Sequence, residues 1–184
     1  MKDGCHEKRI VVTVSYVVRG NDILLYLRNS GIGQGLWNGF GGHVGSGETV
    51  EQAAAREFRE ESGLTALKQK KVGIGYVTID GVDKMFEIHF FLVTEFEGKL
   101  QDSDEMIPMW LPMERIPYSQ MWPSDRHALP IFLHGGKCIC RFHLQQSWSW
   151  HWIRKTDKIP DGFDLYEENK IRDNFNLHQK LPTL

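Results

Sequence analysis

The sequence predicts an α/β fold in which a mixed β-sheet is covered by helices, within one domain. Three runs rich in β-branched and aromatic residues, at 10–18, 72–79 and 86–94, have the composition of strands. The run at 49–61 consists largely of Ala, Arg and Glu, which favour helix. Strands that flank one central helix, with a second helix late in the chain, indicate a sheet sandwiched by helices. A length of 184 residues suits one domain with some chain left over.

The composition is that of a soluble globular protein, with 41% hydrophobic and 25% charged residues. The net charge of −2 carries no basic excess of the kind that nucleic-acid binding requires. No apolar run is long enough to span a bilayer, and the N-terminus lacks the apolar region of a signal peptide. We therefore expect a cytoplasmic monomer that binds neither nucleic acid nor membrane.

Two strands and a glycine-rich loop precede the central helix. Residues 10–18 read as a strand, Asn21 and Asp22 as a turn, and residues 23–27 as the returning strand. Residues 29–47 contain eight glycines among Asn, Ser and Gln, which predicts a loop.

The helix at 49–61 has a start and a stop signal. Thr49 is a suitable N-cap and Gly63 a suitable terminator. Beyond the two strands that follow, we expect a polar loop at 101–108 and a short strand at 109–111. Residues 131–133 are expected in a second helix and residues 138–144 in a late strand, because Cys138 and Cys140 alternate there with larger residues.

The last part of the chain differs from the rest. We expect a domain over residues 1–150 and a C-terminal extension over 151–184 that is docked or partly disordered. Trp148, Trp150 and Trp152 alternate at this boundary. They are expected to pack on the domain, to complete a pocket or to face a partner, of which packing is the simplest.

Three carboxylates gather on one face of the central helix. Glu57, Glu60 and Glu61 are spaced i, i+3 and i+4, so they are neighbours on the helix surface. They repel one another, and they are poorly placed against the helix dipole near the C-terminal end. A divalent cation removes this repulsion. Mg²⁺, with Mn²⁺ as the alternative, prefers such oxygen ligands and shares its sites with substrate phosphates.

These carboxylates belong to a longer pattern, residues 42–64 (GHVGSGETVEQAAAREFREESGL). An isolated acidic run would be a solvated helix face. Here the run stands at fixed offsets from Gly42, Glu48, Arg56 and Gly63, a combination that chance rarely produces. The preceding residues 39–42 (GFGG) let the backbone approach a metal or ligand closely.

This segment resembles the Nudix box at every defined position. The resemblance implies an α/β/α sandwich in which the box forms a loop–helix–loop. It implies that Glu57, Glu60 and Glu61 are metal ligands, and that Glu60 and Glu61 act in catalysis. It also implies that Arg56 and Glu48 support the helix geometry.

The flanking segments at 37–42 (WNGFGG), 103–106 (SDEM) and 121–123 (MWP) resemble the oxidised purine nucleoside triphosphatases, the animal 8-oxo-dGTP diphosphatase type. This resemblance implies hydrolysis of a nucleoside triphosphate such as 8-oxo-dGTP or 2-hydroxy-dATP to monophosphate and pyrophosphate. It implies that Gly41 offers its carbonyl to the metal and that Glu105 is a further metal ligand or base.

The residue types expected around the nucleotide suit their tasks. Trp122 offers a face for stacking a base, and Asn38 offers both a donor and an acceptor. Arg28 suits a phosphate, and Asp125 can donate a hydrogen bond only if an apolar pocket keeps it protonated. The alternative for each of these four residues is a purely structural role, in the core, in a loop or on the surface. The full set of expected nucleotide contacts is Thr13, Arg28, Asn38, Phe40, Gly41, Gly42, His43, Trp122, Pro123, Ser124 and Asp125.

The sequence departs from this subfamily at one place. Where the family has two consecutive acids after Trp-Pro, this chain has Ser124 and Asp125, and a hydroxyl cannot share a proton as a carboxyl pair does. The alternatives are therefore a Nudix hydrolase for an unmodified nucleotide, a nucleotide sugar or a capped RNA end. A Nudix-fold module that binds nucleotide without cleaving it is a further alternative, against which the three intact helix carboxylates speak.

Overall fold

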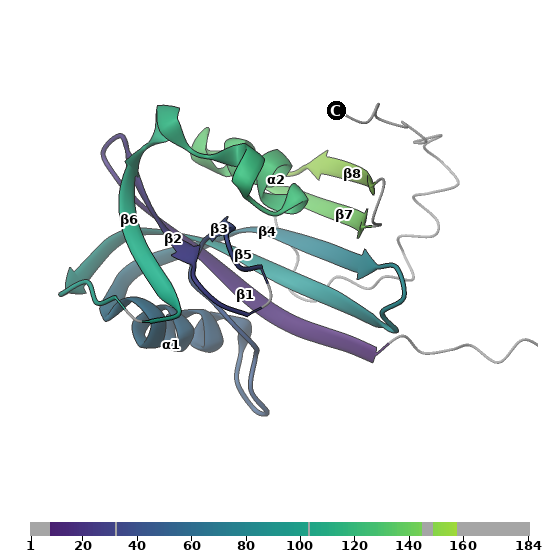
Figure 1. Cartoon of the computed structure of the whole chain (residues 1–184), viewed down its shortest axis with the longest axis horizontal. Coiled ribbons are helices and arrows are strands. Elements are labelled where there is room, and N and C mark those ends of the chain that lie inside the picture. Colours follow the sequence, from purple (N-terminus) through teal and green to yellow (C-terminus); the bar gives the residue numbers. More distant parts are fainter. Residues whose placement is uncertain (1–7, 32, 103, 145–148, 158–184) are drawn as a thin grey trace, which may run out of the picture.

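The computed structural model describes residues 8–31, 33–102, 104–144 and 149–157, which are the coloured parts of Figure 1. The helices are α1 (Val50–Ser62) and α2 (Pro123–Leu133), and the two short 3₁₀ turns are η1 (Met113–Arg115) and η2 (Tyr118–Gln120). The strands are β1 (Lys8–Arg19), β2 (Asp22–Arg28), β3 (Trp37–Asn38), β4 (Leu64–Ile79), β5 (Lys84–Gly98), β6 (Met106–Pro112), β7 (Cys138–Leu144) and β8 (Ser149–Lys155).

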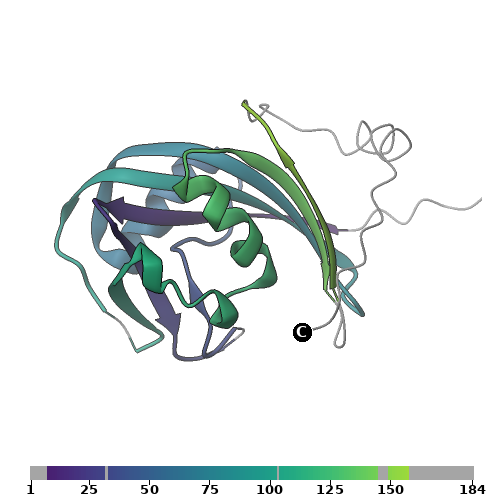
Figure 2. The ribbon, with the colours of Figure 1, turned by 90° about the horizontal axis from the view of Figure 1, so that it is seen from above.

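The described strands form one mixed sheet in the order β3-β2-β1-β5-β4-β7-β8, and β6 pairs with β2. The β1–β5 and β4–β7 pairs are parallel, whereas the other pairs of named strands are antiparallel. The mixed sheet predicted from the sequence is confirmed. Figure 2 shows how strongly the sheet curves around α2.

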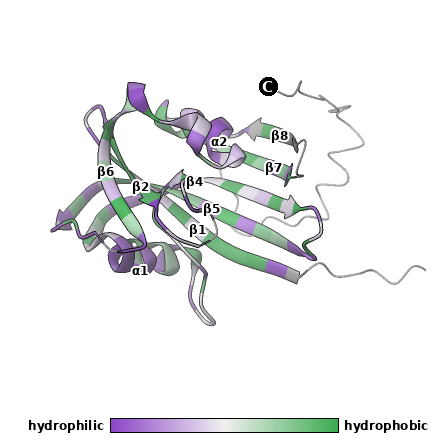
Figure 3. Ribbon diagram, viewed as in Figure 1, coloured by the Kyte–Doolittle hydropathy of each residue, from purple (hydrophilic) through white to green (hydrophobic). Residues whose placement is uncertain are grey.

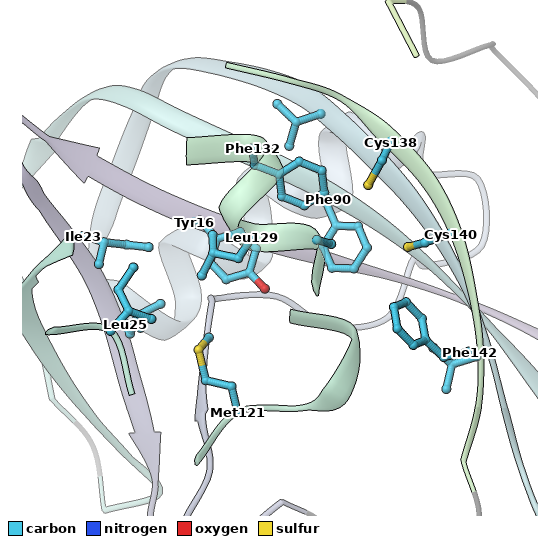
Figure 4. Close-up of a cluster of buried hydrophobic side chains, with 14 residues drawn as sticks. Tyr16, Ile23, Leu25, Phe90, Met121, Leu129, Phe132, Cys138, Cys140 and Phe142 are labelled. Carbon is cyan, nitrogen blue, oxygen red and sulfur yellow. The ribbon is translucent and has the colours of Figure 1, made fainter. Parts of the chain in front are cut away.

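The two helices cover opposite faces of the sheet (Figure 1). Val17 of β1 packs in one apolar cluster with Phe58 of α1. The adjacent Tyr16 packs in another cluster with Leu129 and Phe132 of α2 (Figure 4). Since successive side chains of a strand point to opposite faces, the sheet lies between the helices. The predicted α/β/α sandwich is therefore confirmed.

Helix α1 begins and ends where its sequence signals predict. The Thr49 hydroxyl accepts from the Gln52 N–H at 3.2 Å, and the Gln52 side chain accepts from the Thr49 N–H at 2.9 Å. This reciprocal arrangement is a capping box. At the other end Gly63 adopts φ 73° and donates its N–H to the Arg59 carbonyl at 2.9 Å. Figure 3 shows that the ribbon of α1 is mainly hydrophilic, whereas the central strands are mainly hydrophobic.

Two predicted boundaries are wrong. The loop expected at 29–47 contains the short strand β3, which pairs with Tyr26 and Leu27. Strand β6 begins at Met106, inside the loop expected at 101–108, because it pairs with β2 over its whole length. The second helix expected to contain residues 131–133 is confirmed as α2, which starts at Pro123 because proline suits a first helical position, where no N–H is needed.

Strand β8 pairs antiparallel with β7, so the sheet continues past residue 150 into the segment expected to be an extension. Residues 158–184 and Trp148 lie outside the described residues, as do the side chains of Trp150 and Trp152. Within the described part of the chain, neither helix combines the length and apolarity that crossing a membrane requires.

Candidate active site

Arg56 of α1 connects the helix to the loop before it. Its Nε and Nη2 donate to the two Glu48 carboxylate oxygens at 2.7 and 2.9 Å, and Nη2 also donates to the His43 carbonyl at 3.1 Å. Its Nη1 donates to Glu57 at 2.9 Å and to Glu60 at 3.0 Å. The planar guanidinium permits this fork. Hydrogen bonding to Arg56, and then to the Gly45 N–H, lowers the pKa of Glu48 to about 2.

Gly41, just before the box, and Gly42, its first residue, lie where a side chain would not fit. A Cβ on Gly42 would lie 2.5 Å from the Glu57 carboxyl carbon, and one on Gly41 would lie 2.0 Å from the Thr13 carbonyl oxygen. The Thr13 N–H donates to the Gly42 carbonyl at 2.8 Å, which holds this segment along β1. The absence of Cβ atoms therefore brings the backbone of the loop, β1 and the Glu57 carboxylate together.

Glu61, near the C-terminal end of α1, is half-buried. Burial raises its pKa to about 7, the charges of Glu57 and Glu60 add to the rise, and the N–H of Gly41, which donates to Glu61 at 2.7 Å, opposes it. The Arg28 charge also lowers the pKa of Glu61. Arg28, at the end of β2, is therefore close enough to this carboxylate for its charge to act on it.

The described residues contain no preformed cluster of three side chains that could hold a metal ion. Arg56 engages Glu57 and Glu60, while Gly41 engages Glu61. The donor set nevertheless suits a hard divalent cation. It consists of carboxylate oxygens spaced along one helix face and of the Gly41 carbonyl, which accepts no hydrogen bond from the described residues. Oxygen donors of this kind fit Mg²⁺ or Mn²⁺.

The raised pKa of Glu61 has a consequence for the metal-free protein. The folded state favours the neutral carboxyl of Glu61. Its contribution to the free energy of unfolding is therefore fully present below pH about 4.5 and should be lost as the pH rises through about 7. We expect Glu61→Gln, which stays neutral, to be more stable than the unsubstituted protein at pH 8 by about 2 kcal/mol. Urea unfolding in EDTA at pH 5 and pH 8 measures this, with the exposed Glu51→Gln as the control. If Glu61→Gln lost as much stability between pH 5 and pH 8 as the unsubstituted protein does, Glu61 would not be the source of the pH dependence.

Glu105 lies on the loop before β6 and is exposed. Its carbonyl accepts from the Asn29 N–H at 2.8 Å, and the next residue, Met106, pairs with Arg28. The Glu105 side chain forms no hydrogen bond or ion pair with the described residues. The structure thus places Glu105 beside Arg28 and does not bring its carboxylate into contact with those of α1.

A second group of expected site residues lies at the start of α2, where Pro123 is the first helical residue. Trp122 precedes it and is half-buried, and a Cβ on Gly33 would lie 3.0 Å from its indole ring. Ser124 and Asp125 are buried, and the Ser124 hydroxyl donates to Asp125 Oδ1 at 3.3 Å. Burial raises the pKa of Asp125 to about 7, and hydrogen bonding to Tyr16 and Ser124 opposes this rise.

The other expected nucleotide contacts lie in different settings. The Asn38 side-chain oxygen accepts from the Gly39 N–H at 2.8 Å, which leaves its NH₂ group without a partner among the described residues. Phe40 is fully buried against Tyr26 and Phe58, with ring centroids 5.5 and 5.7 Å away. The expectation that the Phe40 side chain contacts nucleotide is therefore wrong for this structure, because it is a core group.

Thr13 and His43 also lie away from Trp122. Thr13 is buried, and its position in β1 points it to the α1 face, opposite to Tyr16. His43 lines a hollow of about 720 Å³ at the N-terminal end of α1, opposite to the end that carries Glu60 and Glu61. The same hollow is lined by Arg9, Lys71, Glu87 and His89.

Sequence reasoning missed two tyrosines. Tyr16 lies close enough to Asp125 to affect its pKa, and the buried Tyr26 lies close enough to Glu61 and Arg28 for both to affect its pKa. In the sequence each reads as one more apolar residue of a strand. Only the packing of strands against α1 and α2 reveals what their hydroxyls approach.

Comparisons with known proteins agree with this geometry. Residues 8–132 match the NUDIX domain family. The chain is 40% identical to the "Oxidized purine nucleoside triphosphate hydrolase" of Danio rerio, over 73% of this chain and 86% of that protein. It is 36% identical to the protein of the same name from Mus musculus, over 72% of this chain and 85% of that protein. The fold matches a crystal structure of a MutT mutator protein from Bacillus halodurans with a TM-score of 0.69 at 24% identity, over 82% of this chain and 99% of the other. With the box on α1 and this match over most of its length, the chain belongs to the Nudix hydrolase family.

Proposed function

We propose that the protein hydrolyses oxidised purine nucleoside triphosphates, such as 8-oxo-dGTP or 2-hydroxy-dATP, to monophosphate and pyrophosphate in a Mg²⁺-dependent reaction. The observation that carries this proposal is the oxygen-lined carboxylate face on α1, held by the hydrogen bonds of Arg56, and the residues 122–125 at the start of α2 are proposed to meet the base. The relatives from Danio rerio and Mus musculus, which are named for this activity, support the substrate class. Such an enzyme would remove damaged precursors from the nucleotide pool.

The α1 side of the site is proposed to carry the chemistry. Nudix hydrolases generally use divalent cations, and here Glu57, Glu60, Glu61 and the Gly41 carbonyl would hold Mg²⁺. When bound, the cation polarises a phosphoryl oxygen and makes a water more acidic. Arg56 keeps Glu57 and Glu60 in position, and Arg28, whose charge acts on Glu61, would offset negative charge of the phosphates.

The proton of the attacking water needs an acceptor on the protein. Glu60 and Glu61 are on the helix face that meets the phosphates, and Glu105 projects into solvent beside Arg28. We propose that one of these three carboxylates takes the proton.

The α2 side is proposed to recognise the base. Trp122 offers an aromatic face for stacking, and the free NH₂ group of Asn38 can donate to a base acceptor. Asp125 can donate a hydrogen bond when protonated and accept one when ionised, and its pKa of about 7 makes both forms accessible near neutral pH.

Product analysis tests the proposed reaction. With 8-oxo-dGTP and Mg²⁺, we expect one pyrophosphate for each monophosphate formed and no orthophosphate. EDTA should stop the reaction and an excess of Mg²⁺ should restore it. Release of orthophosphate, or turnover that is unaffected by EDTA, would overturn the proposal.

Removal of the Trp122 indole should weaken nucleotide binding more than it slows the chemical step. Stacking of one base contributes about 1–3 kcal/mol, so we expect Trp122→Ala to raise KM about tenfold to a hundredfold with little change in kcat. Steady-state kinetics with 8-oxo-dGTP measures this. The matched control is Trp110→Ala, which removes a half-buried indole that stacks on Phe96 at 5.8 Å. Equal rises of KM in both variants would contradict a role in base stacking.

We also propose that the enzyme acts as a monomer in the cytoplasm, on free nucleotides. The net charge of −2 supports a small substrate whose phosphates are balanced locally, rather than a nucleic-acid polymer. Light scattering after size-exclusion chromatography should give the mass of one chain, and a dimer mass would contradict this part of the proposal.

A further inference from the structure

The glycine-rich turn between β2 and β3 passes beside the Trp122 indole. A Cβ on Gly33 would lie 3.0 Å from Trp122 Cζ2, 3.6 Å from Cε2 and 3.7 Å from Nε1. Two carbon atoms in contact prefer a spacing of about 3.5–4.0 Å, so the shortest of these separations is too tight. The backbone at Gly33 therefore fills the space next to the nitrogen side of the indole, and a side chain there would press on the ring.

The neighbouring glycines of the same turn have no such contact. Gly31, Gly33 and Gly35 adopt positive φ angles of 75°, 84° and 81°. Glycine reaches such angles without strain, so the path of the backbone explains all three. A Cβ on Gly35 would meet nothing within 4 Å, and one on Gly31 would meet only Arg28 Nη2, at 3.9 Å. At Gly33, by contrast, the missing Cβ also makes room for Trp122.

Backbone contacts hold the turn against the segment that carries Trp122. The Gly35 N–H donates to the Arg28 carbonyl at 2.8 Å, which ties the turn to the end of β2. Just past the turn, Trp37 forms a β-bridge with Met121, the residue before Trp122. The position of the turn relative to the indole is therefore set by main-chain contacts on both sides.

The main chain of Trp122 is fixed as well. Its carbonyl accepts from the Asp125 N–H at 3.0 Å and from the Arg126 N–H at 3.3 Å, in the first turn of α2. The side chain of the preceding Met121 is anchored in the apolar cluster of Figure 4. What can still vary is the rotation of the indole about its side-chain bonds, and Gly33 lies on one side of that ring.

We propose that Gly33 is a positioning residue, which holds the Trp122 indole at the angle from which it stacks on the purine base. The inference rests on the proposed function and adds to it the residue that orients the stacking ring. A side chain at position 33 would displace the indole by a few tenths of an ångström. Stacking depends on the overlap and tilt of the two rings, so binding of the base should weaken.

Gly33→Ala and Gly35→Ala form a matched pair of variants. Both place alanine at nearly the same positive φ in the same turn, so the backbone strain should lower Tm by a similar amount in each. Only Gly33→Ala brings a Cβ against Trp122. A difference between the two variants in the measurements below therefore reports the contact with the indole. If alanine prevents folding, the asparagine pair Gly33→Asn and Gly35→Asn replaces it, because asparagine tolerates positive φ better.

Fluorine NMR of the full chain labelled with 5-fluorotryptophan reports on the indole without any nucleotide. The Trp122→Phe variant identifies the Trp122 signal, which is the one that it removes. We expect Gly33→Ala to shift this signal and Gly35→Ala to leave it where it is in the unsubstituted protein. An unshifted signal in Gly33→Ala, or equal shifts in both variants, would overturn the proposal.

Steady-state kinetics with 8-oxo-dGTP tests the consequence for binding. We expect Gly33→Ala to raise KM about threefold to tenfold with little change in kcat, because the indole is tilted but not removed. Gly35→Ala should change neither constant. An equal rise of KM in the two variants, or a fall of kcat at unchanged KM in Gly33→Ala, would contradict a positioning role.

The Trp122→Phe background shows whether Gly33 acts through the indole. A phenylalanine ring can still stack but lacks the nitrogen side that faces Gly33, so Gly33→Ala should raise KM less in this background than in the unsubstituted protein. The same factor in both backgrounds would refute the proposal. Failure of the proposed function is distinguishable, because the unsubstituted protein would then not hydrolyse 8-oxo-dGTP, whereas the fluorine signal of Trp122 would still separate Gly33→Ala from Gly35→Ala.

Discussion

Glu57→Gln should lower kcat about a thousandfold while leaving the fold intact. The Glu57 carboxylate is 17% exposed, and it lies against Gly42 and beside the Arg56 guanidinium. Glutamine has nearly the same shape, so the packing survives while the negative charge proposed to hold the cation is lost. A metal ion contributes several kcal/mol to stabilising a phosphoryl transition state, and each 1.36 kcal/mol is tenfold in rate.

The measurement is kcat for 8-oxo-dGTP over a Mg²⁺ titration, together with circular dichroism to confirm the fold. Glu51→Gln is the matched control, because it removes an exposed carboxylate from the first turn of the same helix. We expect its rate to stay close to that of the unsubstituted protein. A comparable rate for Glu57→Gln would mean that α1 does not carry the metal site.

Arg56→Lys should reduce kcat about tenfold to a hundredfold and also destabilise the loop before α1. Arg56 donates to Glu48 through two nitrogens and reaches Glu57 and Glu60 through a third. A lysine keeps the positive charge but cannot form this fork. Loss of groups that orient metal ligands commonly has an effect of this size.

Arg59→Lys serves as the control, since Arg59 is exposed in the last turn of the same helix. Raising the Mg²⁺ concentration should recover part of the rate that Arg56→Lys loses, because the substitution disturbs the positions of the proposed metal ligands. Equal activity of both variants would show that the hydrogen bonds of Arg56 are not needed to position the carboxylates.

The parts of the site that are local in sequence could be predicted from sequence. The capping residues Thr49 and Gly63 act within one turn of α1, so residue type alone determines where the helix ends. The spacing of Glu57, Glu60 and Glu61 likewise places them on one face without any knowledge of the tertiary structure.

Contacts between distant strands could not be predicted in the same way. Nothing in the sequence near Tyr16 indicates that it lies on the α2 face of the sheet, close enough to Asp125 for each to affect the pKa of the other. The start of β6 at Met106 depends on its pairing with β2, which is a long-range contact. Phe40 follows Asn38 and Gly39 in a motif that suggested a ligand contact, yet its burial against Phe58 depends on how α1 packs.

Base preference is the property that the sequence pattern left most open. The sequence motif shows only that Ser124 stands where the resembling family has an acid. The structure adds that Asp125 is buried, that one of its carboxylate oxygens has no hydrogen-bond partner among the described residues, and that Tyr16 is close enough to affect its pKa. Base preference therefore depends on the residues that surround Asp125 as well as on the side chains that would contact the base.

The most direct test of the proposed function is the ratio of kcat/KM for 8-oxo-dGTP to that for dGTP, measured in Mg²⁺ by pyrophosphate release. The same assay with 2-hydroxy-dATP and dATP covers the second pair of bases. A clear preference for the oxidised member of either pair is the expected result. Equal rates for oxidised and unmodified nucleotides, or turnover only of nucleotide sugars or capped RNA ends, would contradict it.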